Sequence, residues 1–181
     1  MVSPYPWIHG HLRIRADVLG QVEQAAREGY ARDEEACGYL RGPASEPLLC
    51  NEHVPMVNLA NQLHRMDPVQ YFRTGRSYFE FNGEKFRRAV NASELEGIPI
   101  KVLYHSHLDA GAYFSPTDAA AMSQGKMPES EGGAIEMGPG PPYPLAFLVT
   151  SVRAGNIDGH GLFIWDEQAR AFVPSEFAVV E

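Results

Sequence analysis

The first third of the chain alternates between short apolar runs and polar turns. Residues 11–15 alternate between polar and apolar side chains, which predicts a half-buried strand. Apolar residues then recur every three to four positions, which predicts a helix that Asp17 caps and Gly29 ends. Two buried strands are expected over residues 36–40 and 48–57, and the glycine and prolines between them indicate a hairpin.

Helical and extended patterns also alternate in the rest of the sequence. Asp67-Pro68 is expected to open a short helix, and residues 83–96 have a helical period whose apolar side includes Phe86 and Leu95. Residues 100–105 are mostly apolar, as expected of a central strand. Further strands are predicted over residues 143–152, 161–165 and 171–173, with a turn over residues 156–159.

The order of these elements predicts an α/β fold in which a mixed β-sheet is flanked by helices. Residues 1–181 are expected to form a single domain, because no linker separates two folding units. Residues 124–142 contain five glycines and four prolines that break every period, so this segment is predicted to be a loop of 19 residues. Loops of this length in compact domains are usually functional or disordered.

The composition narrows the classes of partner. The 15 basic and 23 acidic residues give a net charge of −8, which disfavours binding to nucleic acid or to anionic lipid. No apolar stretch reaches the roughly 20 residues of a membrane span. Cys37 and Cys50 form no Cys-x-x-Cys pair and could make one disulfide at most, so a reduced, cytoplasmic protein is expected.

The segment His105-Ser106-His107 and the acid Asp118 form the strongest candidate site. Residues i and i+2 of a strand point to the same side, so the two imidazoles can converge on one ion while Ser106 points away. The run from Ser115 to Asp118 predicts a helix start, with serine as the N-cap and an acid at the third position. Two histidines and one aspartate are ligands that zinc accepts while a fourth position stays open for water.

Each part of this site also has an ordinary structural explanation. Helix capping alone accounts for Ser115 and Asp118 without a metal. A second His-x-His pair, His9 and His11, has Val22 at the position where an acid would be needed, so we interpret it as an incidental surface pair. Structural or surface roles are expected for the isolated histidines His53, His64 and His160.

The conjunction of these motifs with an upstream acid is more specific. Glu35 precedes a small residue, a cysteine and a glycine, and the set of this glutamate, His-x-His and Ser-x-x-Asp resembles the JAMM (MPN+) metalloprotease family. The resemblance covers roughly residues 12–165 and extends to Asn58 and to Met66-Asp67-Pro68. It is similar in layout to stand-alone bacterial members, and it implies a cytidine-deaminase-like JAMM/MPN domain.

Three features of the sequence depart from the family pattern. Leu108 and Phe114 stand where the family usually has proline, which affects the expected shape of the loop between them more than the chemistry. The segment 124–142 looks like an insertion relative to a compact family member.

The residues around the upstream acid need separate assignments. The family motif selects Glu35, and strand alternation then points its neighbour Glu34 away as a solvated residue. A nucleophilic role for Cys37 would need an activating histidine and a site that stabilises the thiolate. We therefore interpret Cys37 as a packed core thiol.

The resemblance implies a zinc metallopeptidase with one Zn²⁺ and a bound water per chain. His105, His107 and Asp118 would hold the metal, Glu35 would transfer the proton of the water, and Ser115 would donate to the oxyanion. The substrates implied are ubiquitin-like or sulfur-carrier proteins joined through a C-terminal Gly-Gly. Release of cysteine from a carrier and deubiquitinase-like isopeptide cleavage both stay open, and so does the oligomeric state, including a homodimer.

The sequence also bears on two other functional classes. Domains of this fold that lack the ligands serve as catalytically silent scaffolds, whereas here all five positions are filled. A zinc nucleobase deaminase would need a Pro-Cys-x-x-Cys motif, which the sequence does not contain.

Overall fold

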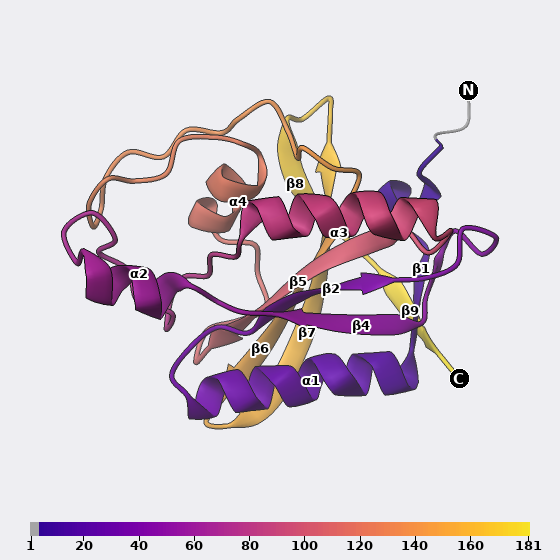
Figure 1. The fold of residues 1–181 in the computed structure, drawn as a ribbon, viewed down its shortest axis with the longest axis horizontal. Helices are drawn as coiled ribbons and strands as arrows, with labels where there is room; N and C mark the ends of the chain where they lie inside the picture. The colour runs from indigo at the N-terminus through magenta and orange to yellow at the C-terminus, as the bar shows by residue number, and fades with distance from the viewer. Residues whose placement is uncertain (1–3) are drawn as a thin grey trace.

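A six-stranded mixed sheet forms the centre of the structure, a computed structural model that describes residues 4–181 (Figure 1). Only β5 and β6 are parallel neighbours, and the other neighbouring pairs are antiparallel, which confirms the predicted mixed sheet. The strand order is β4 (Glu52–Met56), β2 (Cys37–Arg41), β5 (Ile100–Leu108), β6 (Ala146–Arg153), β7 (Asn156–Asp166) and β8 (Ala171–Ser175).

A second sheet and the helices complete the fold. The small sheet has three parallel strands in the order β3 (Leu49–Cys50), β1 (Leu12–Arg15) and β9 (Phe177–Val180). None of the helices within residues 4–181 is long and apolar enough to cross a membrane. The helices are the 3₁₀ helix η1 (Pro6–His9) and the α-helices α1 (Ala16–Ala31), α2 (Ala60–Met66), α3 (Gly83–Leu95) and α4 (Pro116–Met122).

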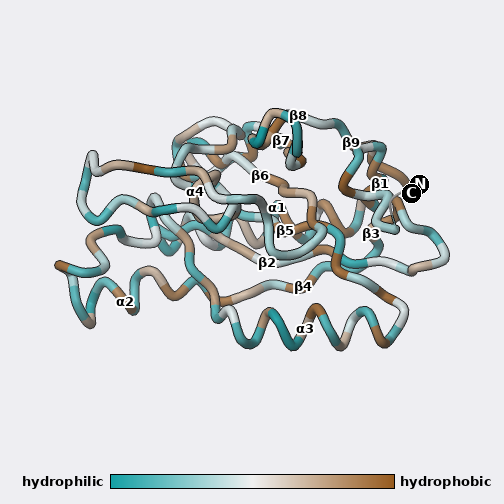
Figure 2. The backbone as a smooth tube through the Cα atoms, turned by 90° about the horizontal axis from the view of Figure 1, so that it is seen from above, coloured by the Kyte–Doolittle hydropathy of each residue, from teal (hydrophilic) through white to brown (hydrophobic). Residues whose placement is uncertain are grey.

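Strand β5 is buried at all nine positions and separates two hydrophobic clusters. Val102 and Tyr104 belong to the cluster that contains the buried face of α1, whereas Leu103 belongs to the cluster under α3. Figure 2 shows α3 along one side of the molecule, with hydrophobic and hydrophilic residues alternating along the helix. Because side chains alternate along a strand, His105 and His107 lie on the same side as Leu103.

The boundaries of α1 differ from the prediction at both ends. The helix begins at Ala16, so Asp17 lies in its first turn and is not the N-cap. Gly29 does not end the helix; it is buried, and a Cβ atom there would lie 2.7 Å from the carbonyl oxygen of Glu34. The glycine therefore allows the following segment to approach the helix closely, while Asp33, with φ of 57°, makes the left-handed turn.

Three further sequence predictions are wrong. Asp67 does not open a helix; it is the C-cap of α2, with φ of −150° and ψ of 90°, because a residue before proline avoids the helical region. The predicted strand over residues 48–57 divides into β3 and β4, which belong to different sheets. Leu95 is 90% exposed and takes no part in the buried face of α3.

The C-terminal strands also differ in detail from the prediction. The tight turn between β6 and β7 lies at Ala154-Gly155, both with positive φ, so β7 already begins at Asn156, where a turn was expected. The strand β9, which pairs with β1 at the opposite end of the sequence, was not predicted. The strand with which β9 pairs lies far away in the sequence, and no local pattern of apolar and polar residues predicts β9 itself.

The segment 124–142 contains no helix or named strand, as predicted, but its ends are held together. Lys126 and Glu136 form an isolated antiparallel bridge, and the backbone N–H of Gly138 donates to Ser123 Oγ at 2.9 Å. A Cβ atom on Gly138 would lie 2.1 Å from the carbonyl oxygen of Ser123, so only glycine allows this approach. The loop and α2 project from the same end of the molecule (Figures 1 and 2).

The fully buried side chain of Lys101 connects β5 to the loop between β2 and β3. Its ammonium donates to the carbonyl oxygens of Pro43, Glu46 and Leu49 at 3.0, 2.9 and 2.7 Å. The ammonium also lies 5.7 Å from the centre of the Trp7 ring. The carbonyl oxygens of Pro43 and Glu46 also accept backbone N–H groups of this loop, so Lys101 adds a charged donor to an existing turn and ties it to β5.

Replacing Lys101 with methionine tests this role. We expect Lys101→Met to lower the free energy of unfolding by about 2–4 kcal/mol, because three backbone acceptors lose a charged donor while the packing volume is kept. The exposed Lys85 on α3 provides the matched control, and Lys85→Met should change it by less than about 0.5 kcal/mol. Urea denaturation measures both; equal stability of the two variants would contradict the assignment.

Candidate metal centre

Three ligand atoms converge at the end of β5. His105 and His107 lie on this strand, and Asp118 lies in the first turn of α4. The two Nε2 atoms are 3.1 Å apart, and Asp118 Oδ2 lies 3.2 Å from Nε2 of His105 and 3.3 Å from Nε2 of His107. All three residues are buried, and they form a group that could hold a metal ion. We call these three atoms the ligand triangle.

The ligand triangle has the dimensions and the chemistry of a metal site. In a tetrahedral zinc site with bonds of about 2.0–2.1 Å, neighbouring ligand atoms are about 3.3 Å apart. His107 Nδ1 lies 2.8 Å from the carbonyl oxygen of Gly111, which assigns its proton to Nδ1 and leaves the electron pair of Nε2 facing the triangle. Because Asp118 Oδ2 is also an acceptor, a cation at this position would relieve the repulsion between the two atoms.

Asp118 is held ionised by its neighbours. Burial raises its pKa, but the charge of His105 and the hydrogen bonds with His105, His107 and Ser115 outweigh this and bring the pKa well below the usual range. The Ser115 N–H donates to Asp118 Oδ2 at 3.0 Å, and the Asp118 N–H donates to Ser115 Oγ at 3.0 Å. The predicted helix cap and the predicted convergence with the histidines are therefore both present, since the same carboxylate oxygen takes part in both.

Ser106 points to the opposite side of the strand from the histidines, as predicted, and connects β5 to the start of β2. Its hydroxyl accepts a hydrogen bond from the N–H of Ala36 at 2.8 Å, and its own N–H donates to the carbonyl oxygen of Ala36 at 2.9 Å. Both groups are buried. This double link fixes the residue before Ala36, which is Glu35, relative to the histidine strand.

Glu35 is buried beside the ligand triangle. Its side chain shares a pocket of about 110 Å³ with His107, Ser115 and Asp118. Burial and the charge of Asp118 raise the pKa of Glu35 well above its usual value, and the charge of Arg73 opposes this shift. The Oε2 atom of Glu35 has no hydrogen-bond partner among residues 4–181. A buried carboxyl oxygen without a hydrogen-bond partner destabilises the folded protein. Groups of this kind, with a shifted pKa, are typical of sites that bind or transform a ligand.

The structure separates the neighbours of Glu35 from the site. Burial raises the pKa of the Cys37 thiol to about 12, so the thiolate is not populated at neutral pH and the interpretation as a packed thiol is confirmed. Glu34 points away from the ligand triangle and pairs with Arg32 at 2.9 Å. Its side chain is only 21% exposed and also contacts Asn61, so the expectation that it is solvated is wrong.

Aromatic residues fix the two imidazole rings. The buried Phe79 stacks on His105, with ring centroids 4.5 Å apart and an interplanar angle of 19°. The exposed Tyr113 packs edge-on against His107 at 5.1 Å. Phe114, which stands where the family has proline, packs on Phe172 with centroids 4.6 Å apart and so anchors the loop after β5. Phe79 was not identified from the sequence, because no period or motif surrounds it.

Asn58 holds the segment around Glu35 in place. Its side-chain amide donates to the carbonyl oxygens of Glu35 and Tyr78 at 2.9 and 3.0 Å. Its carbonyl oxygen accepts from the backbone N–H groups of Ala60 and Glu80 at 3.0 and 3.1 Å. The sequence singled out Asn58 by resemblance only, and the structure gives the physical reason: one amide joins three backbone segments.

The remaining histidines lie away from the ligand triangle, as expected. His9 and His11 are exposed. His64 Nδ1 lies 2.7 Å from the carbonyl oxygen of Tyr71, and His53 Nε2 lies 2.7 Å from the hydroxyl of Tyr104. His160 contacts Thr150 and Glu23 through its two ring nitrogens. These contacts confirm structural or surface roles.

Comparison with known proteins gives a family match and several similar structures. A family model described as prokaryotic homologs of the JAB domain matches residues 16–158. No curated protein matches the sequence. Among solved structures, a protein from Desulfitobacterium hafniense is similar, with 17% identity and a TM-score of 0.56 over 94% of this chain and 93% of that chain. A protein from Salinibacter ruber has 18% identity and a TM-score of 0.54 over 94% and 92%. A JAB1/MPN domain protein from Archaeoglobus fulgidus has 13% identity and a TM-score of 0.49 over 94% and 100%.

Metal content is the first property to measure. We expect protein purified without chelator to contain about one zinc ion per chain, because the ligand triangle offers two imidazoles and a carboxylate. His107→Ala should lose the metal, whereas His9→Ala, at an exposed histidine outside the site, should keep it. Elemental analysis decides; a folded wild-type protein that stays metal-free after zinc addition would exclude the site.

The burial of Glu35 predicts a pH-dependent stability of the metal-free protein. Because its folded-state pKa is raised, its contribution to stability is full below the unfolded pKa of about 4.3 and is lost as the pH rises through the folded pKa. In chelator at pH 7, Glu35→Gln should therefore be more stable than the wild type by about 1–3 kcal/mol, and the difference should shrink toward acidic pH.

Glu34→Gln is the matched control for this measurement, since Glu34 is ion-paired and lies outside the pocket. We expect it to show no such gain. Urea denaturation over a pH series compares the three proteins. A Glu35→Gln variant that is no more stable than the wild type at pH 7 would show that the carboxyl group is not desolvated.

Proposed function

Since the chain belongs to the family of prokaryotic JAB-domain homologs, we propose that it is a JAMM-type zinc metallopeptidase. Its reaction is hydrolysis of a peptide or isopeptide bond after the C-terminal Gly-Gly of a ubiquitin-like or sulfur-carrier protein. The observation that supports this proposal best is the unpartnered Glu35 carboxyl oxygen in the pocket that also contains His107 and Asp118. His105, His107 and Asp118 would hold the zinc. When bound, such an ion acidifies water and so supplies a nucleophile at neutral pH.

Glu35 is the proton carrier in this proposal. Its buried Oε2 atom is free to accept a hydrogen bond, and burial raises its pKa well above the usual value, which favours a group that takes up a proton and later releases it. It accepts the proton of the attacking water and returns it to the nitrogen of the leaving amine. The links from Ser106 and Asn58 keep its backbone fixed during both transfers.

Ser115 is the donor to the carbonyl oxygen of the scissile bond. Its Oγ accepts the N–H of Asp118, so its own hydrogen is available to a ligand in the pocket that both residues line. A donor at this position stabilises negative charge as it develops on the carbonyl oxygen. The helix-capping hydrogen bond therefore orients the Ser115 hydroxyl group and leaves the hydroxyl hydrogen available for a ligand.

The small size of the pocket supports a glycine-containing tail as substrate. Glycine has no side chain to contact the walls, which include Arg76, Leu108 and Tyr113. An extended tail can reach a narrow site of this kind with its folded domain outside. The alternative raised by the sequence, a catalytically silent scaffold, gives no reason for a desolvated glutamate beside the ligand triangle.

The test is cleavage of carrier adducts by matched variants. Glu35→Gln should keep its metal but lose about 100- to 10,000-fold of the turnover, because proton transfer is removed while the ligands stay in place. Glu34→Gln should keep both. Mass spectrometry of the products, with carriers that end in Gly-Gly before the scissile bond, measures turnover and the site of cleavage.

Two outcomes would contradict the proposal. Near wild-type turnover of Glu35→Gln would remove the proton-carrier role from this residue. Equal rates on Gly-Gly and Val-Gly tails would remove the carrier assignment, because we expect a valine at the penultimate position to slow cleavage at least about tenfold by its contact with the pocket walls.

A further inference from the structure

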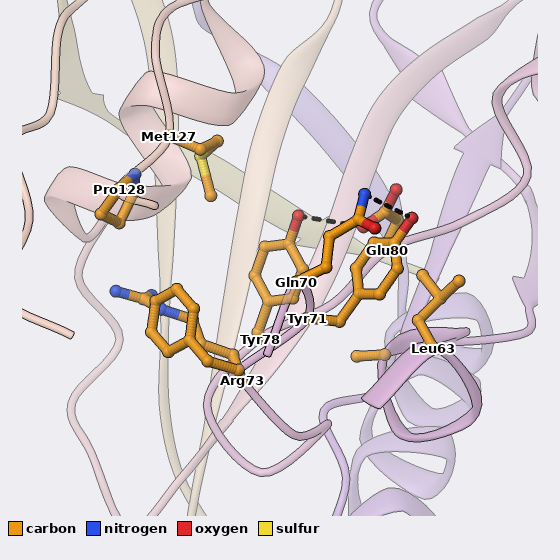
Figure 3. A pocket seen from close by; sticks show the side chains of 10 residues that line it. Leu63, Gln70, Tyr71, Arg73, Tyr78, Glu80, Met127 and Pro128 are labelled. Carbon is orange, nitrogen blue, oxygen red and sulfur yellow. Dashed lines mark hydrogen bonds between the residues drawn. The ribbon is translucent and has the colours of Figure 1, made fainter. Parts of the chain in front are cut away.

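A second pocket is lined largely by residues of the segment 70–80 and is connected to the candidate metal centre through Arg73, which contacts α4. It measures about 170 Å³, smaller than the roughly 300 Å³ at which pockets for drug-sized ligands begin. Figure 3 shows that its walls come from the segment after α2 and from the loop after α4. We call it the side pocket; its lining residues include Leu63, Tyr71, Arg73, Tyr78, Glu80 and Met127.

Arg73 joins the side pocket to the candidate metal centre. Its Nη1 donates to Thr117 Oγ1 at 2.9 Å, and Thr117 directly precedes Asp118 in α4. The guanidinium lies 5.4 Å from the centre of the Phe72 ring. No carboxylate among residues 4–181 lies within ion-pair distance of Arg73, whereas Arg76 pairs with two aspartates. Arg73 is thus a positive charge whose anionic partner is not supplied by the described part of the chain.

The charges of the side pocket act on the groups of the metal centre. Burial is the main cause that raises the pKa of Glu35, and Arg73 lowers it. Burial and Glu80 raise the pKa of Tyr78, and Asp118 adds to this shift. A ligand that extends from the pocket at the metal centre into the side pocket would therefore bring its own charge close to both Arg73 and Glu35.

We propose that the side pocket binds the single residue released from the carrier, and that Arg73 binds the α-carboxylate of that residue. This inference rests on the proposed function and identifies its leaving group. In a C-terminal residue, the carboxyl carbon lies only about 2.5 Å beyond the scissile nitrogen, two bonds away. A guanidinium offers paired donors to such a carboxylate. An isopeptide to a lysine side chain has a methylene at this position and gives Arg73 no partner.

The placement of the other charged group agrees with this assignment. In Figure 3, the guanidinium of Arg73 and the carboxylate of Glu80 lie on opposite sides of Tyr78. The Glu80 carboxylate accepts from the Tyr78 hydroxyl at 3.2 Å, so one of its acceptor positions is already used. A substrate carboxylate at Arg73 is therefore kept apart from Glu80, the acid among the described residues that line the side pocket.

The reaction that this assignment implies is a simple hydrolysis. The bond between the carbonyl carbon of the second glycine and the nitrogen of the last residue breaks. The oxygen of water bonds to that carbon, one proton of the water goes to the nitrogen through Glu35, and the second proton is released when the new carboxyl group ionises. The products are a carrier that ends in Gly-Gly with a free carboxylate and one free amino acid.

Binding can be measured without turnover in the Glu35→Gln protein. The probes are an N-acetylated tail peptide ending in Gly-Gly-Leu and the same peptide with a C-terminal amide. We expect the acid to bind about 10- to 150-fold more tightly than the amide, the range of a hydrogen bond to a charged group. Adding Arg73→Gln should remove this difference, because it weakens binding of the acid only, and the amide has no carboxylate for Arg73 to bind. Adding Arg65→Gln, at an exposed arginine of α2, is the control and should keep the difference between acid and amide.

Equal binding of acid and amide to the Glu35→Gln protein would overturn the inference, even if Arg73→Gln does not fold. Wild-type turnover of three carrier adducts then tests the proposed function separately: the acid, the amide, and an isopeptide to lysine. Fastest cleavage of the acid supports both conclusions, and equally fast cleavage of the isopeptide overturns the leaving-group assignment. Acid-selective binding with no cleavage of any adduct would keep Arg73 as a carboxylate site and contradict the hydrolase.

Discussion

The pair of hydrogen bonds between Ser106 and Ala36 is the constraint on which the candidate metal centre depends. It joins the strand that carries two metal ligands to the segment that carries the buried glutamate, and these segments are about 70 positions apart in sequence. Both partners are buried, so neither bond competes with water. The residue between the two histidines is therefore a structural requirement of the site, although it faces away from the ligand triangle.

Residues whose roles follow from local spacing could be predicted from the sequence. The alternation of a strand places His105 and His107 on one side, and the serine and proline at the start of α4 place Asp118 at its third position. Glu35 required the resemblance, because three adjacent acids fit its position equally well by pattern. The mixed sheet and α3 also followed from the order and the period of apolar residues.

The contributions of the segment 58–81 could not be predicted in the same way. It contains Asn58, Arg73 and Phe79, which contact the groups around the metal centre, but most of it has no helical or strand period. Its course is set by side-chain hydrogen bonds to backbone groups that are distant in sequence. Such contacts depend on where other segments have already folded, so a local pattern carries no signal of them. The same reason explains the missed strand β9, whose partner is the first strand of the chain.

The reciprocal hydrogen bonds between Ser115 and Asp118 also bear on how the site is assembled. Because the backbone N–H of Ser115 already holds the Asp118 carboxylate, and Gly111 and Phe79 hold the two imidazoles, the ligand atoms have little conformational freedom left to lose. The entropy of ordering the site is thus lost during folding and not during metal binding. A centre preorganised in this way would let an ion enter or leave while the domain stays folded, unlike small zinc domains in which the metal itself drives folding.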